Sequence, residues 1–237
     1  MVAPLEILLS LFFPSECESC GVHLRAPAAP GLCGTCERAV HWLTPPFCRS
    51  CGRPCAAGPC AACRAARPAF DTAWACAAYA GPWRDLLRRY KFGRRRSLAG
   101  LFGRALIRFA RERAAEGDRA GWDVVTAVPL DPVTERGRGF NQCAPLVARL
   151  ARELGIPAFD GLRRQRGSSA QSLLGRRARF ENVKGRFRVR SGRAVRGRRV
   201  LLVDDVITTG VTVSECARAL KDAGASSVTV LACARVL

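Results

Sequence analysis

The stretch VLLVDDVITTGVTVSECARAL, residues 200–220, decides the fold of this chain. It begins with an apolar run that is typical of a buried strand. Two adjacent acids, Asp204 and Asp205, follow, then a short loop rich in threonine, and then apolar residues at helical spacing. A strand that leads through such a loop into a helix predicts an α/β sheet with a ligand site beyond the carboxyl ends of its strands.

The rest of the second half of the chain alternates strands and helices in the same way. Apolar and β-branched runs predict four strands, at 74–79, 122–130, 198–206 and 226–237. Helical spacing of apolar residues predicts helices at 86–109, 143–155 and 213–225, the second closed by Gly155 and the third by Gly224. This alternation predicts a mainly parallel sheet with helices on both faces.

Cysteine dominates the first part of the chain. Nine of the 13 cysteines lie between Cys17 and Cys63, mostly as C-x-x-C pairs. Close-set pairs favour metal binding over disulfides, and each pair can give two thiolates to one tetrahedral zinc. The spacing predicts two zinc sites in a double zinc ribbon, with the ligands Cys17, Cys20, Cys33 and Cys36, and Cys48, Cys51, Cys60 and Cys63.

Two interpretations of the cysteine module stay open. It could be a structural staple for a region too small to fold alone, or a contact surface for nucleic acid or protein. Cys55 could replace a neighbouring ligand or be a spare thiol. We expect two domains, with an N-terminal helix and the zinc ribbon at 1–70 and the α/β domain at 71–237.

The charge balance points to an anionic partner. The chain carries 39 Lys and Arg against 19 Asp and Glu, a formal net charge of +20, and nearly all of its cations are arginine. Nucleic acid and phosphate esters are the usual partners of such a surface. An arginine-rich, lysine-poor composition also arises in GC-rich genomes, so composition alone leaves both explanations open.

The N-terminal run MVAPLEILLSLFF predicts a short amphipathic helix, because it lacks the basic start and the small-residue cleavage site of an export signal. No apolar run approaches the roughly 20 residues of a membrane span. We therefore expect a cytoplasmic protein without membrane insertion. The polar, basic stretch at 161–189 predicts either a disordered connector or a mobile functional loop.

The acids and the loop after them suit a phosphorylated sugar. Asp204 and Asp205 can accept hydrogen bonds from two vicinal hydroxyls. Backbone N–H groups, threonine hydroxyls and the positive end of the helix dipole can converge on a phosphate at residues 208–212. An acid pair at a strand end could instead hold Mg²⁺ in a receiver-like domain or merely cap a turn.

The stretch at 200–220 resembles the 5-phosphoribosyl-1-pyrophosphate (PRPP) signature of type I phosphoribosyltransferases. Together with the cysteine module it resembles the ComF family of competence-associated proteins. The resemblance covers nearly the whole chain and includes, in order, YKFGRRRSLAGLFGRAL at 90–106, AVPLDPVTERGRGFNQ at 127–142 and QSLLGRRARFENVKGRF at 171–187.

The resemblance implies roles for particular residues. Asp204 and Asp205 would bind the ribose hydroxyls and serve catalysis, and the loop at 129–133 would bind pyrophosphate. The 5-phosphate would bind to Thr208, Thr209, Gly210, Val211 and Thr212. Beside the pyrophosphate loop would lie Arg136, Arg138, Asn141 and Gln142, and a flexible hood would contribute Gln171, Arg176, Arg179 and Asn182.

Two functions follow from the resemblance. The first is a Mg²⁺-dependent phosphoribosyltransferase, a glycosyltransferase with pyrophosphate as leaving group and an unidentified acceptor. The alternative is a non-catalytic protein that binds single-stranded DNA or senses PRPP. In either case the resemblance implies a role in natural transformation beside the DNA-uptake machinery.

Overall fold

The computed structural model describes residues 16–24, 31–56, 58–93, 95–115, 121–165 and 183–237. The N-terminal helix predicted from residues 1–13 therefore lies outside the described residues. None of the helices in the described ranges is long and apolar enough to cross a bilayer.

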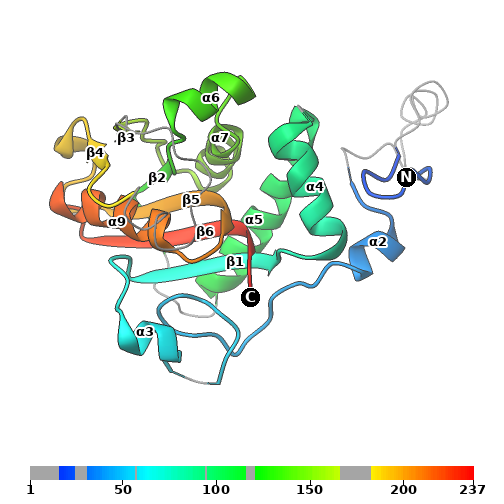
Figure 1. Cartoon of the computed structure of the whole chain (residues 1–237), viewed down its shortest axis with the longest axis horizontal. Helices are drawn as coiled ribbons and strands as arrows, with labels where there is room; N and C mark the ends of the chain where they lie inside the picture. Colours follow the sequence, from blue (N-terminus) through cyan, green and yellow to red (C-terminus); the bar gives the residue numbers. More distant parts are fainter. Residues whose placement is uncertain (1–15, 25–30, 57, 94, 116–120, 166–182) are drawn as a thin grey trace.

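A four-stranded sheet in the order β1-β6-β5-β2 forms the centre of the molecule (Figure 1). All three strand pairings are parallel. The strands are β1 (Thr72–Ala78), β2 (Val124–Ala127), β5 (Arg199–Ile207) and β6 (Ser227–Arg235). Side chains on both faces of β5 and β6 are buried, which explains their nearly continuous apolar sequences. The predicted parallel sheet is confirmed.

Helices cover both faces of this sheet. One face packs against α4 (Gly81–Phe92), α5 (Ala99–Ala115) and α7 (Cys143–Leu154). The other face packs against α9 (Val211–Asp222) and a hairpin of β3 (Leu162–Arg164) and β4 (Phe187–Val189). Three short helices are α2 (Gly34–Arg38), α3 (Ala61–Ala65) and α6 (Pro132–Arg138), and 3-10 turns lie at Arg96–Leu98 and Gly192–Ala194.

The single helix expected over 86–109 is two helices in the structure. α4 ends at Gly93, whose N–H donates to the Arg89 carbonyl at 2.8 Å. A Cβ at Gly93 would lie only 2.8 Å from that carbonyl oxygen, so a larger residue does not fit this turn. The break lets α4 and α5 both pack on the same face of the sheet.

The segment between the two halves of the ribbon covers the free edge of β1. The Leu43 N–H donates to the Cys76 carbonyl and the Ala78 N–H to the His41 carbonyl, both at 2.9 Å. This cover satisfies backbone groups that an edge strand would otherwise expose to other chains.

The second half of the ribbon docks on the same strand. The Ala73 N–H donates to the Ser50 carbonyl at 2.8 Å. A Cβ at Gly52, whose φ is +68°, would lie 1.9 Å from the Ala73 carbonyl oxygen, so only glycine allows this approach. Figure 1 shows α3 of this half below β1 and α2 of the first half far from it, beyond α4.

Candidate functional site

A cavity of about 210 Å³ opens where β2 and β5 end, as expected for a parallel sheet. Several residues predicted from the sequence meet in its wall, although they come from β5, the start of α9, the loop after β2, and α6. They are Asp204, Asp205, Thr208, Gly210, Thr212 and Arg138, with Pro129 and Leu130 of the predicted pyrophosphate loop.

The acid pair lies within β5, which continues to Ile207. Asp205 is 7% exposed, and its carboxylate lies 2.8 Å from the Lys91 ammonium of α4. The Asp204 carboxylate accepts a 2.8 Å hydrogen bond from the Asp205 backbone N–H. The strand thus presents two adjacent carboxylates, one of them already paired with a cation.

Burial sets the charge state of this cluster. Burial raises the pKa of Asp204 to about 7. The negative charge of Asp205 also raises this pKa, whereas the positive charge of Lys91 lowers it. Burial alone would lower the pKa of Lys91. The charge of Asp205, the hydrogen bond to its carboxylate and the charge of Asp204 together outweigh burial, so the Lys91 pKa lies above its usual value. Lys91 is therefore a cation throughout the physiological range.

The start of α9 forms the next wall. Gly210 is the N-cap residue of this helix and has a φ of +82°, a left-handed conformation that favours glycine. Thr208, Gly210 and Thr212 line the cavity, and the first turn of α9 presents its N–H groups there. Thr209 and Val211 line a neighbouring cavity of about 400 Å³ beside the second half of the ribbon. The geometry suits an anion held at the helix N-terminus.

Hydrogen bonds fix the loop after β2. The Asp131 side chain caps α6 by accepting from the Val133 N–H at 3.0 Å. The Asn141 side-chain amide donates to the Val128 carbonyl at 3.1 Å, and its oxygen accepts from the Cys143 N–H at 2.9 Å. Asn141 thus joins the end of β2 to the start of α7, on the side of the cavity opposite α9.

Two arginines bring positive charge into the cavity. Arg138 donates to the Gln142 side-chain oxygen at 3.0 Å, and its guanidinium lies 4.8 Å from the centroid of the Phe92 ring. Arg164 of β3 also lines the cavity, with Nε 3.9 Å from the Asp131 carboxylate. Gln142 itself is fully buried and orients Arg138, while Arg136 is exposed on α6.

Sequence reasoning missed three residues of this site, Lys91, Arg164 and Cys143. The thiol of Cys143 and the two carboxylates offer ligand atoms within 4.8 Å of one another. Burial and the nearby acids raise the pKa of Cys143, so its thiol stays neutral. The predicted hood residues Gln171, Arg176, Arg179 and Asn182 lie outside the described residues.

Eight cysteines form two groups of four, in the pairing that their spacing predicts. The groups are Cys17, Cys20, Cys33 and Cys36, and Cys48, Cys51, Cys60 and Cys63. The sulfur atoms of Cys20 and Cys33 lie 3.7 Å apart, as do those of Cys51 and Cys60. A tetrahedral zinc with Zn–S bonds of about 2.3 Å holds its sulfur atoms about 3.8 Å apart, so both groups fit structural zinc.

Backbone donors prepare two of these thiols, one in each group, for metal. Burial raises the pKa of Cys17 and of Cys48, but hydrogen bonds from backbone N–H groups outweigh it and lower each pKa to about 6. A thiol with such a pKa is largely thiolate at neutral pH, the form that binds zinc. Cys55 belongs to neither group of four, and its Sγ lies 3.9 Å from the Gly58 carbonyl oxygen.

Comparison with known protein families matches both halves of the chain. Residues 141–235 match the model of the phosphoribosyl transferase domain, and residues 8–67 match the model of the double zinc ribbon domain. These matches agree with the sheet and with the two groups of cysteines.

Curated relatives match the chain along nearly its whole length. It is 33% identical over 231 residues to DNA utilization protein YhgH of Escherichia coli K12, covering 96% of this chain and 100% of that protein. It is 30% identical over 228 residues to competence protein F of Haemophilus influenzae, covering 94% of this chain and 98% of that protein. The chain therefore belongs to the ComF family, which joins a phosphoribosyltransferase domain to an N-terminal double zinc ribbon.

Proposed function

We propose that this protein binds PRPP with Mg²⁺ and transfers its phosphoribosyl group to an acceptor, releasing pyrophosphate. The observation that carries the proposal is a cavity in which two adjacent acids, a helix N-terminus and two arginines meet. The acids offer acceptors to ribose hydroxyls, the start of α9 offers donors to the 5-phosphate, and Arg138 and Arg164 offer cations to pyrophosphate.

The distribution of charge suits this reaction. As pyrophosphate leaves the anomeric carbon, positive charge develops on the sugar and negative charge on the leaving group. Asp204 and Asp205 would lie beside the sugar and offset its charge, while Arg138 and Arg164 would stabilise the departing oxygens.

The donor set also suits Mg²⁺. This ion prefers oxygen ligands, keeps several waters and binds largely through substrate phosphates. The carboxylates of Asp204 and Asp205 lie close enough to hold such waters, and the neutral thiol of Cys143 does not compete for the ion. When bound, Mg²⁺ would neutralise part of the pyrophosphate charge.

We also propose a domain boundary at residue 70, and a cytoplasmic location. β1 begins at Thr72, two residues after the buried Phe70, which supports the division into 1–70 and 71–237. Eight cysteines must stay reduced to hold zinc, which favours a reducing compartment.

Isothermal titration calorimetry of the full chain with PRPP tests this function. We expect saturable binding to a single site in the presence of Mg²⁺, and weaker binding of ribose 5-phosphate, which lacks the pyrophosphate group. Pyrophosphate release from PRPP in the presence of a panel of bases and amines then tests transfer. The absence of PRPP binding at millimolar concentration would exclude both the enzyme and a PRPP sensor.

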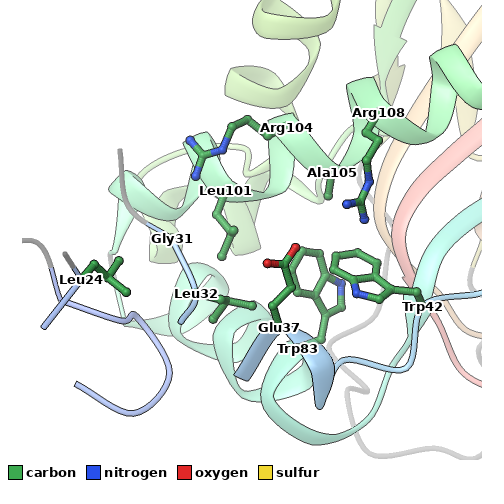
Figure 2. Close-up of a pocket in the computed structure, with 10 residues that line it drawn as sticks. All are labelled: Leu24, Gly31, Leu32, Glu37, Trp42, Trp83, Leu101, Arg104, Ala105 and Arg108. Atoms are coloured by element: carbon green, nitrogen blue, oxygen red, sulfur yellow. The ribbon is translucent and has the colours of Figure 1, made fainter. Parts of the chain in front are cut away.

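A second candidate function, binding of single-stranded DNA, has separate support on the face formed by α5, α7 and the first half of the ribbon. A cavity of about 580 Å³ lies there between α4, α5 and the ribbon. Figure 2 shows the Trp42 and Trp83 rings in its wall, with Arg108 pointing toward Trp42. The Arg108 guanidinium lies 4.6 Å from the centroid of the half-buried Trp42 ring. Aromatic rings and stacked arginines are common contacts for unpaired bases.

A row of arginines continues from this cavity. A second cavity of about 410 Å³ shares Arg104 and Arg108 with the first and adds Arg111 and Arg149. Three acids, Glu37, Glu112 and Glu153, offset part of the charge of these four arginines. A nucleic acid strand could place one base near Trp42 and its phosphates along this row. The names of the curated relatives, which refer to DNA utilization and competence, point the same way.

Titration of a fluorescent oligothymidylate at several salt concentrations tests the DNA function. We expect Arg108→Ala and Arg149→Ala each to reduce the slope of log K against log salt by about 0.7, the value for one phosphate contact on a single strand. The control is Arg193→Ala, an exposed arginine beside the C-terminal end of α9, on the opposite side of the sheet. An equal effect of all three variants, or binding that does not respond to salt, contradicts this location.

PRPP should change DNA affinity if the protein is a sensor.

A further inference from the structure

Lysine is rare in this chain, yet one lysine lies in the candidate PRPP site. The three lysines are Lys91, Lys184 and Lys221, against 36 arginines. The Lys91 side chain is 15% exposed and its ammonium lies 2.8 Å from Asp205, whose side chain is 10% exposed. An ammonium is a compact point charge, so it fits beside a carboxylate where the planar fork of an arginine would fill the space needed by a ligand.

The last turn of α4 holds Lys91 in this place. The neighbouring Tyr90 is fully buried, and its hydroxyl donates to the Gln142 carbonyl at 2.6 Å. Gln142 in turn accepts from Arg138 through its side chain. One hydrogen-bonded chain therefore joins the turn that carries Lys91 to the start of α7 and to an arginine of the cavity.

The outer side of the same turn carries the first half of the zinc ribbon. Arg89 donates to the Glu18 carbonyl at 2.7 Å, and Arg95 lies 3.5 Å from the Glu18 carboxylate. Glu18 lies between the zinc ligands Cys17 and Cys20. α4 is thus fixed from both sides, which limits the positions that the Lys91 ammonium can adopt.

We infer that Lys91 is a positioning residue of the ribose site: its ammonium fixes one oxygen of Asp205 and lets both carboxylates face the sugar together. The inference rests on the proposed binding of PRPP. Two adjacent carboxylates repel each other and tend to share a proton, which would remove one acceptor for the ribose hydroxyls. A cation fixed on one oxygen of Asp205 offsets this repulsion and leaves the other carboxylate oxygens free to accept.

Calorimetry with two ligands tests this role. We expect Lys91→Met to lower the affinity for Mg²⁺ and PRPP about 10- to 100-fold, the effect of weakening a hydrogen bond to a charged group. Its affinity for Mg²⁺ and inorganic pyrophosphate, which has no ribose, should change less than three-fold. A loss of structure would lower both affinities together, so the ratio of the two separates positioning from folding. Lys91→Arg should recover part of the PRPP affinity, because it restores the charge but not the size.

The matched control is Lys221→Met, which removes a lysine that also lies 2.8 Å from a carboxylate, Asp71, but outside the cavity. It should leave both affinities unchanged. Equal PRPP affinity in Lys91→Met and the unmodified protein would overturn the inference, as would parallel losses for PRPP and pyrophosphate. Failure of the unmodified protein to bind PRPP is a different result, because it contradicts the proposed function itself.

Discussion

Replacement of both acids, Asp204→Asn with Asp205→Asn, should lower the affinity for PRPP at least 100-fold and abolish pyrophosphate release. An amide is a weaker acceptor than a carboxylate and cannot offset positive charge on the sugar. Each lost hydrogen bond to a charged group costs about 1.5–3 kcal/mol, so two such losses are enough for this change. Calorimetry with PRPP and Mg²⁺ measures the affinity directly.

A stability control separates loss of the site from loss of the fold. The Asp204 pKa lies near 7 in the folded protein and at 3.8 in its unperturbed state. Between these values the folded state holds a proton that the unfolded state has lost, so the stability of the unmodified protein falls as the pH rises from about 4 to 7. Asp204→Asn removes this penalty, and its amide oxygen can still accept from the Asp205 N–H.

We therefore expect Asp204→Asn to unfold at a higher temperature than the unmodified protein at pH 8, and at the same temperature below pH 4. Thermal unfolding followed by circular dichroism at both pH values measures this. If Asp204→Asn is stable but binds PRPP more weakly, the defect lies in the site. Unchanged PRPP affinity in the double variant contradicts the assignment of the acids.

Features encoded in short stretches of sequence could be predicted. The apolar run, the acid pair and the glycine before α9 lie within one segment, and the strand, loop and helix form where that pattern places them. The cysteine spacing likewise predicts which four thiols share each metal, because the two thiols of a C-x-x-C pair lie close enough to bind the same ion.

Features that depend on distant segments could not be predicted in the same way. Lys91 lies in the last turn of a helix, where a cation is common because it suits the helix dipole. The residues around it do not indicate that it pairs with Asp205. Arg164 enters the cavity from β3, on a hairpin whose second strand begins only at Phe187. The folding of α4 and of this hairpin onto the sheet brings both cations to the same cavity.

Loss of the second zinc site should have a larger effect on stability than loss of the first. The second half of the ribbon contacts the sheet through its own backbone carbonyls. That of Ser50 accepts from the Ala73 N–H, and that of Cys51 accepts from the Arg235 side chain. The chain after it is tied to α9, because the Ala69 N–H donates to the Ser214 hydroxyl at 3.0 Å. The first half is held by polar contacts of two arginine side chains, Arg89 of α4 and Arg95 just after it, which are easier to lose.

Cys51→Ser combined with Cys60→Ser should remove one zinc per chain and lower the free energy of unfolding by about 4 kcal/mol, a large effect of the kind that follows loss of a metal site. For a chain of this size that corresponds to a fall in Tm of about 8–16 °C. The affinity for PRPP should also fall, because the cavity beside this zinc site shares Gly210 with the candidate PRPP site. Zinc content by atomic emission and thermal unfolding measure the two effects.

Cys17→Ser combined with Cys33→Ser is the matched control, since it removes two ligands of the other site. We expect the same loss of one zinc but less than half the fall in Tm, because that half of the ribbon does not cover the edge of β1. If both double variants lower the Tm equally, the contacts at Ser50 and Cys51 do not stabilise the sheet. If neither double variant lowers the Tm, zinc orders only the ribbon itself, and the 41–43 segment alone covers the edge of β1.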